Sequence, residues 1–506
     1  MARHVLCAYL FHITGAKAAA TFGSVFNSPP SPPLPLLFPQ LPTTAKLEPV
    51  RAVRMLVRHA SSEVPGTFDT LYRASSRAAH GMGSSSRVQS SSQAQSLLTA
   101  SFAAVSPGLP ISVADEMLQY ALSFFLGWKR MCKHSTEQTC QRIRESTDPR
   151  ARPFSCGVSR SWMHPRHACL PHRTWNRTLN GVQETGSASD ADADAILALI
   201  VLVVRFEATG KAWWYDMGQW AYDSCKAFVQ FSTELNTDGG ERLVKPGTCH
   251  RGWACAVPSH LSPAHYRVFD KYMVDYAPLF NTERLRAGSL AAQIEAEAYS
   301  SMWVQLVRTS YRVLGAAQCP HTGLFLSAFV PNSLRAATKG NVSKQCRGDT
   351  SPGEEFGRDA ARVAWRIFLD YAWFGERLAQ GLLEPLTRQL VSKLTLVDES
   401  CSRVSCNVKL ALDAGCMVRS TAQAWTEDPS MTAPLAAALM VQSHPETLKS
   451  PQGAALVLMA KLIQEQFYAM VAGERAEEQT LASSGLPWAA LSMLTLVSGR
   501  SSEPGV

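Results

Sequence analysis

Apolar residues recur at helical spacing along most of the chain after residue 105. In the stretch 360–374, Val363, Ile367 and Tyr371 follow one another at intervals of four, which places them on one face of a helix. Runs that alternate with period two are scarce, so the sequence predicts an all-α fold with one large domain. Helices are expected over 113–127, 191–206, 262–277, 289–315, 360–374, 377–394, 408–423, 432–443, 453–472 and 486–498.

The first 105 residues have a different composition. Prolines are concentrated over 29–42, and an Arg/Ser-rich stretch with few acids follows to about residue 95. Proline tracts are extended and serine tracts are flexible, so neither forms a core. We therefore expect residues 1–105 to be a largely disordered leader, 106–500 the catalytic domain and 501–506 a tail. Residues 129–175 and 335–357 interrupt the helical pattern and are interpreted as surface insertions.

The leader indicates targeting. Residues 2–20 have a basic start, a modest apolar stretch and small residues at the end, as a secretory signal peptide does. The Arg/Ser-rich composition also fits an organellar transit peptide. We expect a secreted, extracellular protein, with organelle targeting as the alternative.

Charge and apolar runs restrict the partners. The formal net charge is +8, of which the leader carries +6 and the remaining 401 residues only +2. A nearly neutral body excludes nucleic acid as the main partner, because phosphate binding needs a concentrated basic face. The longest apolar run, 196–204, is half of the roughly 18 residues that span a bilayer. We expect a monomer without an integral membrane segment.

Thirteen cysteines occur at irregular spacings. Cys249 and Cys255 are close in sequence and could form a bridge in an oxidising compartment, as could a pair among Cys401, Cys406 and Cys416. Cys249, His250 and Cys255 do not match a standard zinc spacing. Ordinary thiols are preferred over a zinc site, and no metal or cofactor is expected.

Three acids alternate at the start of a very apolar helix. Asp190, Asp192 and Asp194 precede and enter the stretch 191–206. One carboxylate at a helix N-terminus is explained by capping and by the helix dipole. Three at the mouth of a buried helix favour a functional cluster.

Two further acids lie beside apolar residues. Asp359 and Arg362 share one helical face at spacing i, i+3, which is typical of a solvated ion pair. Large apolar neighbours place this pair at the edge of a core, where the arginine would keep the carboxylate deprotonated, as a general base needs. Glu116 precedes strongly apolar residues, and partial burial would raise its pKa and suit it to be a general acid. A plain surface glutamate is the alternative.

The chain has twelve tryptophans, and an indole can stack on the apolar face of a sugar ring. Core packing is the commoner role of any single tryptophan. Trp253 lies in the loop-like segment 251–260 and is the best candidate for a sugar platform, because a loop position is less often part of a core.

Four segments, in this order, resemble the family 8 glycoside hydrolases. Residues 186–194 (GSASDADAD) are similar to the family signature ATDADxD, and 258–269 (PSHLSPAHYRVF) to PSYFAPAYYRVF. Residues 359–373 (DAARVAWRIFLDYAW) resemble YDAARVPWRIALDYLW. Residues 467–499 resemble the closing segment of the family. The resemblance covers about 106–500.

The resemblance implies an (α/α)6 barrel and a single-displacement inverting mechanism. A carboxylic acid protonates the glycosidic oxygen while a carboxylate activates water on the opposite face, with the two groups ~6.5–9.5 Å apart. By motif position Asp359 would be the base, Arg362 its positioning partner and Asp190 a ligand of the −1 sugar. The family segment VSEGxxYAL aligns Glu116 with the acid, and Tyr120 with the motif tyrosine that would contact the substrate.

The implied activity is endo-acting hydrolysis of a β-1,4-linked glucan such as cellulose. Chitosan, xylan and mixed-linkage glucan are alternatives within the family, and a polysaccharide lyase is an alternative outside it. Asp115 and Met117 replace the serine and glycine of the acid motif, and His260 replaces an aromatic residue. These departures favour a second hypothesis, a catalytically weakened relative that binds polysaccharide.

Overall fold

A computed structural model describes much of the chain. It covers residues 54, 87–106, 109–145, 170–176, 182–184, 186–207, 212–236, 240–248, 250–281, 288–333, 335–336, 356, 358–396, 408–413, 422–424, 429–441, 451–456, 458–460 and 462–463. The expected helix over 486–498, the tail and most of the leader lie outside the described residues.

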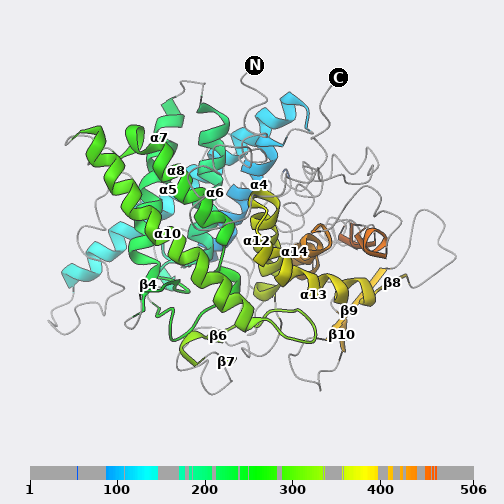
Figure 1. Cartoon of the computed structure of the whole chain (residues 1–506). Coiled ribbons are helices and arrows are strands. Elements are labelled where there is room, and N and C mark those ends of the chain that lie inside the picture. The colour runs from blue at the N-terminus through cyan, green and yellow to red at the C-terminus, as the bar shows by residue number, and fades with distance from the viewer. Residues whose placement is uncertain are drawn as a thin grey trace.

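Helices form a two-layered barrel of antiparallel pairs (Figure 1). In each pair a nearly fully buried helix is followed by one with an exposed face, so the first belongs to an inner layer and the second to an outer layer. This confirms the predicted (α/α)6 architecture. The pairs are α4 (Ser90–Val105) with α5 (Ile111–Glu145), α6 (Ser189–Arg205) with α7 (Ala212–Phe231), α8 (Pro263–Phe280) with α10 (Ser289–Ala317), α12 (Arg358–Phe374) with α13 (Arg377–Lys393), and α14 (Pro429–Leu439) with the short helical segments 451–456, 458–460 and 462–463.

Short antiparallel strands connect the helices. One sheet has the order β1-β2-β3, another the order β10-β9-β8, and β4-β5 and β6-β7 form two hairpins. There are two 3-10 turns: η5 (Pro258–His260) precedes the helix α8, and η6 (Pro331–Ser333) follows the strand β6. The strands are β1 (Arg87–Gln89), β2 (Thr174–Asn176), β3 (Val182–Glu184), β4 (Thr233–Leu235), β5 (Arg242–Val244), β6 (Phe329–Val330), β7 (Arg335–Ala336), β8 (Leu394–Leu396), β9 (Val408–Asp413) and β10 (Ala422–Ala424).

Helix α4 corrects the predicted domain boundary. The expectation that residues 1–105 form a leader is wrong for 87–105, because β1 and α4 belong to the fold and α4 is nearly all buried. A helix rich in serine and glutamine can be buried because its polar groups are satisfied. Ser96, Thr99 and Ser101 donate to carbonyls four residues earlier, and Gln93 donates to the carbonyl of Phe124.

Three other expectations also differ from the structure. The helix expected over 408–423 is wrong: the segment contains β9 and β10, and Val408, Leu410 and Leu412 alternate with the other residues as a strand requires. The segment 129–175 is not simply an insertion, since α5 continues to Glu145 and Trp175 is fully buried. Helix α7 was not predicted.

Helices α6 and α12 are joined by two buried ion pairs. Arg362 Nη1 lies 3.4 Å from Asp190 Oδ2, and Arg366 Nη2 lies 2.7 Å from Asp194 Oδ2. Because both pairs advance by four residues, one helical turn, the two helices are parallel and begin at the same end of the barrel. The second pair is fully enclosed: Arg366 is 0% exposed.

Helix α4 begins at that end as well. The Ser90 amide donates to the Arg173 carbonyl at 3.0 Å, and the Arg173 amide donates to the Gly186 carbonyl at 2.7 Å, just before α6. The first turns of α4, α6 and α12 therefore lie together. We call this region the N-terminal end of the barrel.

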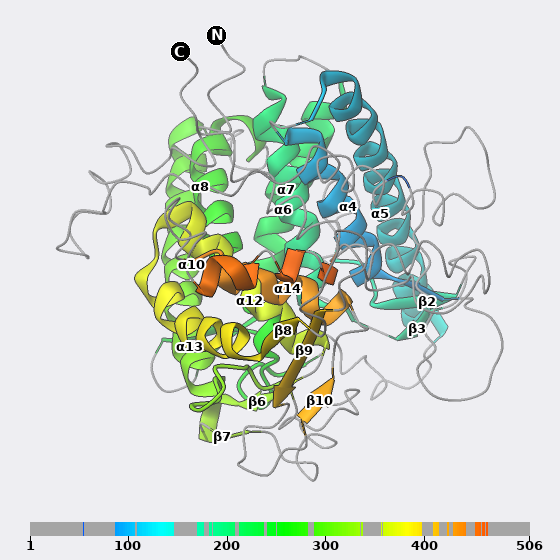
Figure 2. The ribbon, with the colours of Figure 1, turned by 90° about the vertical axis from the view of Figure 1, so that its right-hand side faces the viewer.

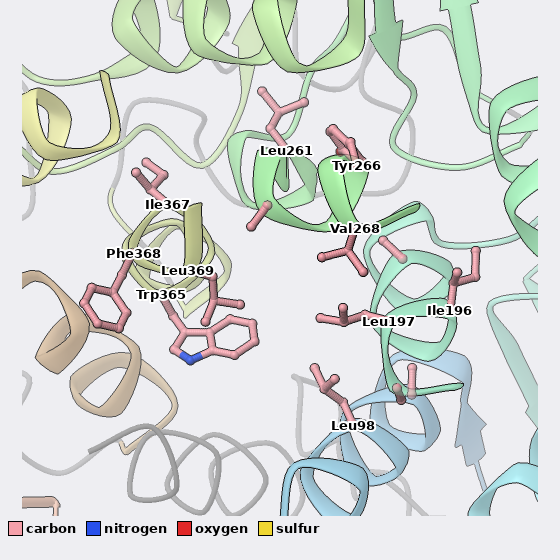
Figure 3. Packing of buried hydrophobic residues seen from close by; sticks show 14 of the residues in the cluster. Leu98, Ile196, Leu197, Leu261, Tyr266, Val268, Trp365, Ile367, Phe368 and Leu369 are labelled. Carbon is pink, nitrogen blue, oxygen red and sulfur yellow. The ribbon is translucent and has the colours of Figure 1, made fainter. Parts of the chain in front are cut away.

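The inside of the barrel is filled by side chains. Figure 3 shows Leu98 of α4, Leu197 of α6, Val268 of α8 and Trp365 of α12 pointing into the same interior. Leu98, Leu197 and Trp365 have no exposed surface. We therefore expect a ligand to bind at an end of the barrel and not in this packed interior. Within the described residues, no helix combines the length and the apolar character that a bilayer crossing requires.

The Arg366–Asp194 pair gives a stability prediction. We expect Arg366→Met to lower the free energy of unfolding by about 3–5 kcal/mol, because it leaves a buried carboxylate without its cation. Lys271→Met is the matched control. Lys271 and Asp275 form an exposed pair at 2.8 Å, and its loss should cost less than about 1 kcal/mol. Chemical denaturation followed by circular dichroism measures both, and equal losses would contradict the assigned role.

Candidate active site

Four polar side chains meet at the N-terminal end of the barrel. We call Asp190, His260, Asp359 and Arg362 the end cluster. Arg362 Nη1 lies 3.0 Å from Asp359 Oδ1 and 3.4 Å from Asp190 Oδ2, and His260 Nε2 lies 3.6 Å from Asp190 Oδ1. The predicted i, i+3 contact between Asp359 and Arg362 is present. One buried guanidinium thus connects two carboxylates from different inner helices.

The two carboxylates of the end cluster differ in exposure. The Asp359 side chain is 47% exposed, whereas that of Asp190 is 7% exposed. Burial alone would raise the pKa of Asp190, but the nearby charges of His260, Arg362 and further arginines outweigh it and hold this pKa well below its usual range. Asp190 is therefore a permanent anion, while Asp359 is open to solvent.

His260 is fixed by hydrogen bonds behind Asp190. Its Nδ1 lies 2.9 Å from Ser189 Oγ, and the Ser189 hydroxyl lies 2.6 Å from the Lys245 carbonyl oxygen. Because that hydroxyl donates to the carbonyl, the imidazole donates from Nδ1 and turns Nε2 toward Asp190. Burial lowers the pKa of His260, and the charge of Asp190 acts against this.

Asp192 has a structural environment. It is fully buried, and burial raises its pKa well above the usual range. Asp194 is likewise buried, and accepts from Arg366 while lying 3.1 Å from His265 Nε2. Of the three alternating acids, only Asp190 belongs to the end cluster.

Backbone contacts hold the start of α6. Gly186 has a φ of +84°, which favours glycine, and its amide donates to His172 Nδ1 at 3.0 Å. The Ser187 amide donates to Thr248 Oγ1 at 3.0 Å. A Cβ on Gly247 would lie 2.0 Å from the Ser187 carbonyl oxygen, so only glycine permits this approach. The position of Asp190 thus depends on the loop around Gly247.

Glu116 does not join this site. It lies on the outer helix α5, where Arg54 forms two hydrogen bonds with its carboxylate, at 2.8 and 2.6 Å, and the Tyr120 hydroxyl donates a third at 2.9 Å. The expectation that burial raises the pKa of Glu116 is wrong, because the hydrogen bond from Arg54 lowers it.

The position of Glu116 along the barrel follows from one hydrogen bond. Gln93 of α4 is level with Phe124 of the antiparallel α5. Glu116 precedes Phe124 by eight residues and is thus level with Ser101, about 16 Å along the helix axis from Ser90. Figure 2 shows the α4–α5 connection at the end of the pair opposite to β2 and β3. The predicted pairing of Glu116 and Tyr120 with Asp359 across one cleft is therefore not what the structure shows.

Trp253 is also not the expected sugar platform. Its side chain belongs to the core, with 7% of the residue exposed. Its Nε1 donates to the Glu234 carbonyl at 3.2 Å, and the Arg312 guanidinium lies 5.7 Å from its ring centroid. The loop position misled the prediction, because this loop folds against the barrel.

The sequence analysis did not single out two residues that lie at this end of the barrel. The exposed Arg173 acts electrostatically on Asp190 and His260, and Ser91 is half-buried in the first turn of α4. Arg173 lies in a segment interpreted as an insertion, and Ser91 in one interpreted as a leader. No motif in the sequence indicated either residue.

The arrangement suits a reaction with water. Asp359 has an exposed carboxylate that contacts Arg362. The guanidinium of Arg362 is in turn held by the buried Asp190. Such a carboxylate can orient and deprotonate a water molecule, and the buried anion behind it can accept hydrogen bonds from hydroxyl groups. The arrangement is compatible with carboxylate-assisted hydrolysis.

Sequence comparisons agree with this class. The chain is 22% identical over 206 residues to Endoglucanase 2 of Ruminiclostridium josui and 24% identical over 205 residues to Endoglucanase A of Acetivibrio thermocellus. Each alignment covers 40% of this chain, but only 35% and 34% of the relative. The chain thus spans about a third of the length of these relatives. No protein-family model matches the sequence.

Solved structures give the fold. The β-1,3-1,4-glucanase from Paenibacillus sp. X4 has a TM-score of 0.55 at 12% identity, with 92% of this chain and 94% of that chain covered. A cold-adapted family 8 xylanase has a TM-score of 0.52 at 14% identity, with 91% and 92% covered. The chain has the (α/α)6 fold of the glycosidases. Its resemblance to family 8 glycoside hydrolases is confirmed.

The close approach at Gly247 gives a second prediction. We expect Gly247→Ala to displace the backbone at Ser187 and to cost about 1–3 kcal/mol in unfolding free energy, as overpacking does. Hydrogen exchange should speed up at the amides of Ser187 and Ser189, which donate to Thr248 and Pro246.

Gly315→Ala is the matched control, because a Cβ there meets nothing within 4 Å. This control lies in α10 and should stabilise the protein by about 0.5–1 kcal/mol. Unchanged exchange at Ser187 in Gly247→Ala would show that the loop does not depend on this glycine.

Proposed function

We propose that the chain is a glycoside hydrolase that binds a β-linked polysaccharide at the N-terminal end of the barrel and cleaves it with inversion. Asp359 acts as the general base that takes a proton from the attacking water. Arg362 positions this carboxylate, and Asp190 binds the hydroxyl groups of the sugar at the point of cleavage. The observation that carries the proposal is the shared guanidinium between an exposed and a buried carboxylate.

A β-1,4-linked glucan is the proposed substrate. The endoglucanase relatives support a glucan, and the solved structures with this fold include a β-1,3-1,4-glucanase and a xylanase. The names of the endoglucanase relatives also support cleavage at interior bonds of the polysaccharide instead of at its ends. Cellulose, mixed-linkage glucan, xylan and chitosan are therefore the panel on which release of reducing sugar is compared.

Extracellular or organellar location remains part of the proposal. Cys255 and Cys319 are each in a disulfide bond, which corrects the preference for ordinary thiols at Cys255. Disulfides persist in oxidising compartments, and this supports secretion over a reducing environment. Intact-mass measurement of the native protein tests it, since removal of a leader and two hydrogens per disulfide both change the mass.

Asp359→Asn tests the proposed base. The assay uses 2,4-dinitrophenyl β-cellotrioside, whose leaving group departs without a proton, so that only attack by water is measured. We expect kcat/KM to fall by about 10²–10⁴-fold, the usual contribution of a general base.

Glu116→Gln is the control for Asp359→Asn. On the dinitrophenyl compound and also on the 4-methoxyphenyl glycoside, whose leaving group benefits from a proton donor, it should stay within about twofold of the wild type, because Glu116 lies away from the end cluster. An Asp359→Asn variant as active as the wild type would refute the proposed base. A large loss in Glu116→Gln alone would return Glu116 to the site.

A further inference from the structure

The first turns of the inner helices differ in their acids. Helix α6 carries Asp190 and Asp192 in its first turn, and α12 carries Asp359. Helix α4 begins at the same end of the barrel, but its first turn consists of serines and contains no acid. Ser91 is the half-buried residue of that turn, between Ser90 and Ser92, which are buried.

Three other acids near this end, Asp190, Asp192 and Glu234, are ion-paired, buried or hydrogen-bonded. Asp190 is an ion-paired anion, and Asp192 has 0% exposure and cannot reach a ligand. Glu234 accepts a hydrogen bond from the Gly252 amide at 2.8 Å. Glu241 of the β4–β5 hairpin is 41% exposed, but it lies 2.8 Å from Arg312 in an ion pair. Of the two carboxylates in the end cluster, Asp359 alone has substantial exposure.

We propose that the end cluster holds only the base half of an inverting site, and that Ser91 occupies the position from which a proton donor would act. This inference rests on the proposed function. The chain then binds glycans and cleaves them at a rate set by the acidity of the leaving group. In the step, Asp359 takes a proton from water, the water oxygen bonds to the anomeric carbon, and the bond to the leaving oxygen breaks. The leaving group departs with the electron pair as an anion and takes its proton from solvent.

The consequence is a steep dependence on the leaving group. A sugar alkoxide is a poor leaving group without a proton, whereas 2,4-dinitrophenolate needs none. A positioned acid contributes about 10²–10⁴-fold, and this is the amount we expect polysaccharide cleavage to lack.

The test compares three aryl β-cellotriosides with the full-length protein. For the wild type we expect kcat/KM to fall by at least about 10²-fold from the 2,4-dinitrophenyl to the 4-methoxyphenyl glycoside, with the 4-nitrophenyl compound between them. Similar rates on all three would overturn the inference, because they would show that a proton donor is present. Loss of all three activities in Asp359→Asn belongs to the proposed function and leaves this comparison unaffected.

Ser91→Glu places a carboxyl group on the first turn of α4, where the helix dipole favours it. We expect it to raise the rate on the 4-methoxyphenyl glycoside by at least about tenfold, and to add a loss of activity at high pH as the new acid deprotonates.

Ser91→Gln is the matched control, with the same shape and no transferable proton, and it should keep the wild-type rates. Wild-type behaviour of Ser91→Glu, with native circular dichroism and glycan retardation in affinity gels, would show that Ser91 is not the position of the missing acid. No hydrolysis of the dinitrophenyl compound by the wild type would refute the proposed function and this inference together.

Discussion

The two ion pairs between α6 and α12 set the geometry on which the site depends. Burying Arg366 and Asp194 in the barrel costs desolvation energy that their attraction roughly offsets, so their contribution is to register more than to stability. A slip of either helix would leave both charges unpaired in the core. The second pair fixes the helices one turn below the first, so Asp190 and Arg362 meet near the first turns of α6 and α12, where His260 also contacts Asp190 and Asp359 contacts Arg362. His265 and Ser262 tie α8 to the same register.

The filled interior confines chemistry to the first turns of the inner helices. At that end the environment separates the carboxylates: neighbouring cations keep Asp190 ionised, whereas burial favours the protonated form of Asp192. Asp359 is half exposed beside Arg362 and thus open to solvent. One cluster of acids in the sequence thus yields an ionised side chain and a buried structural group, and the exposed carboxylate comes from another helix 169 residues later.

The sequence predicted the fold and three residues that lie together at the N-terminal end of the barrel, for reasons that particular residues show. Asp190, Asp359 and Arg362 stood in motifs with fixed spacing, and the structure brings them together. Helix α4 was missed because it is buried on every side, so it has no polar face from which helical spacing can be recognised, and its serines resemble the preceding tract. Glu116 was predicted as the acid because the segment 113–122 aligns with the family segment VSEGxxYAL, but such an alignment does not show at which end of the barrel a residue lies. Trp253 failed because a loop was equated with exposure.

The same structure explains how an acid at the start of α4 could be absent without loss of the fold. Ser91 is half-buried at a helix end, and neither the ion pairs nor the hydrophobic interior involves it. The hydrogen bond that anchors this helix comes from the Ser90 backbone, which any side chain at position 91 leaves intact. Folding therefore places no constraint on the chemical identity of that residue. Asp190, by contrast, also holds Arg362, so the part of the site proposed to bind a glycan is linked to the packing of α6 against α12, and the proposed position of the proton donor is not.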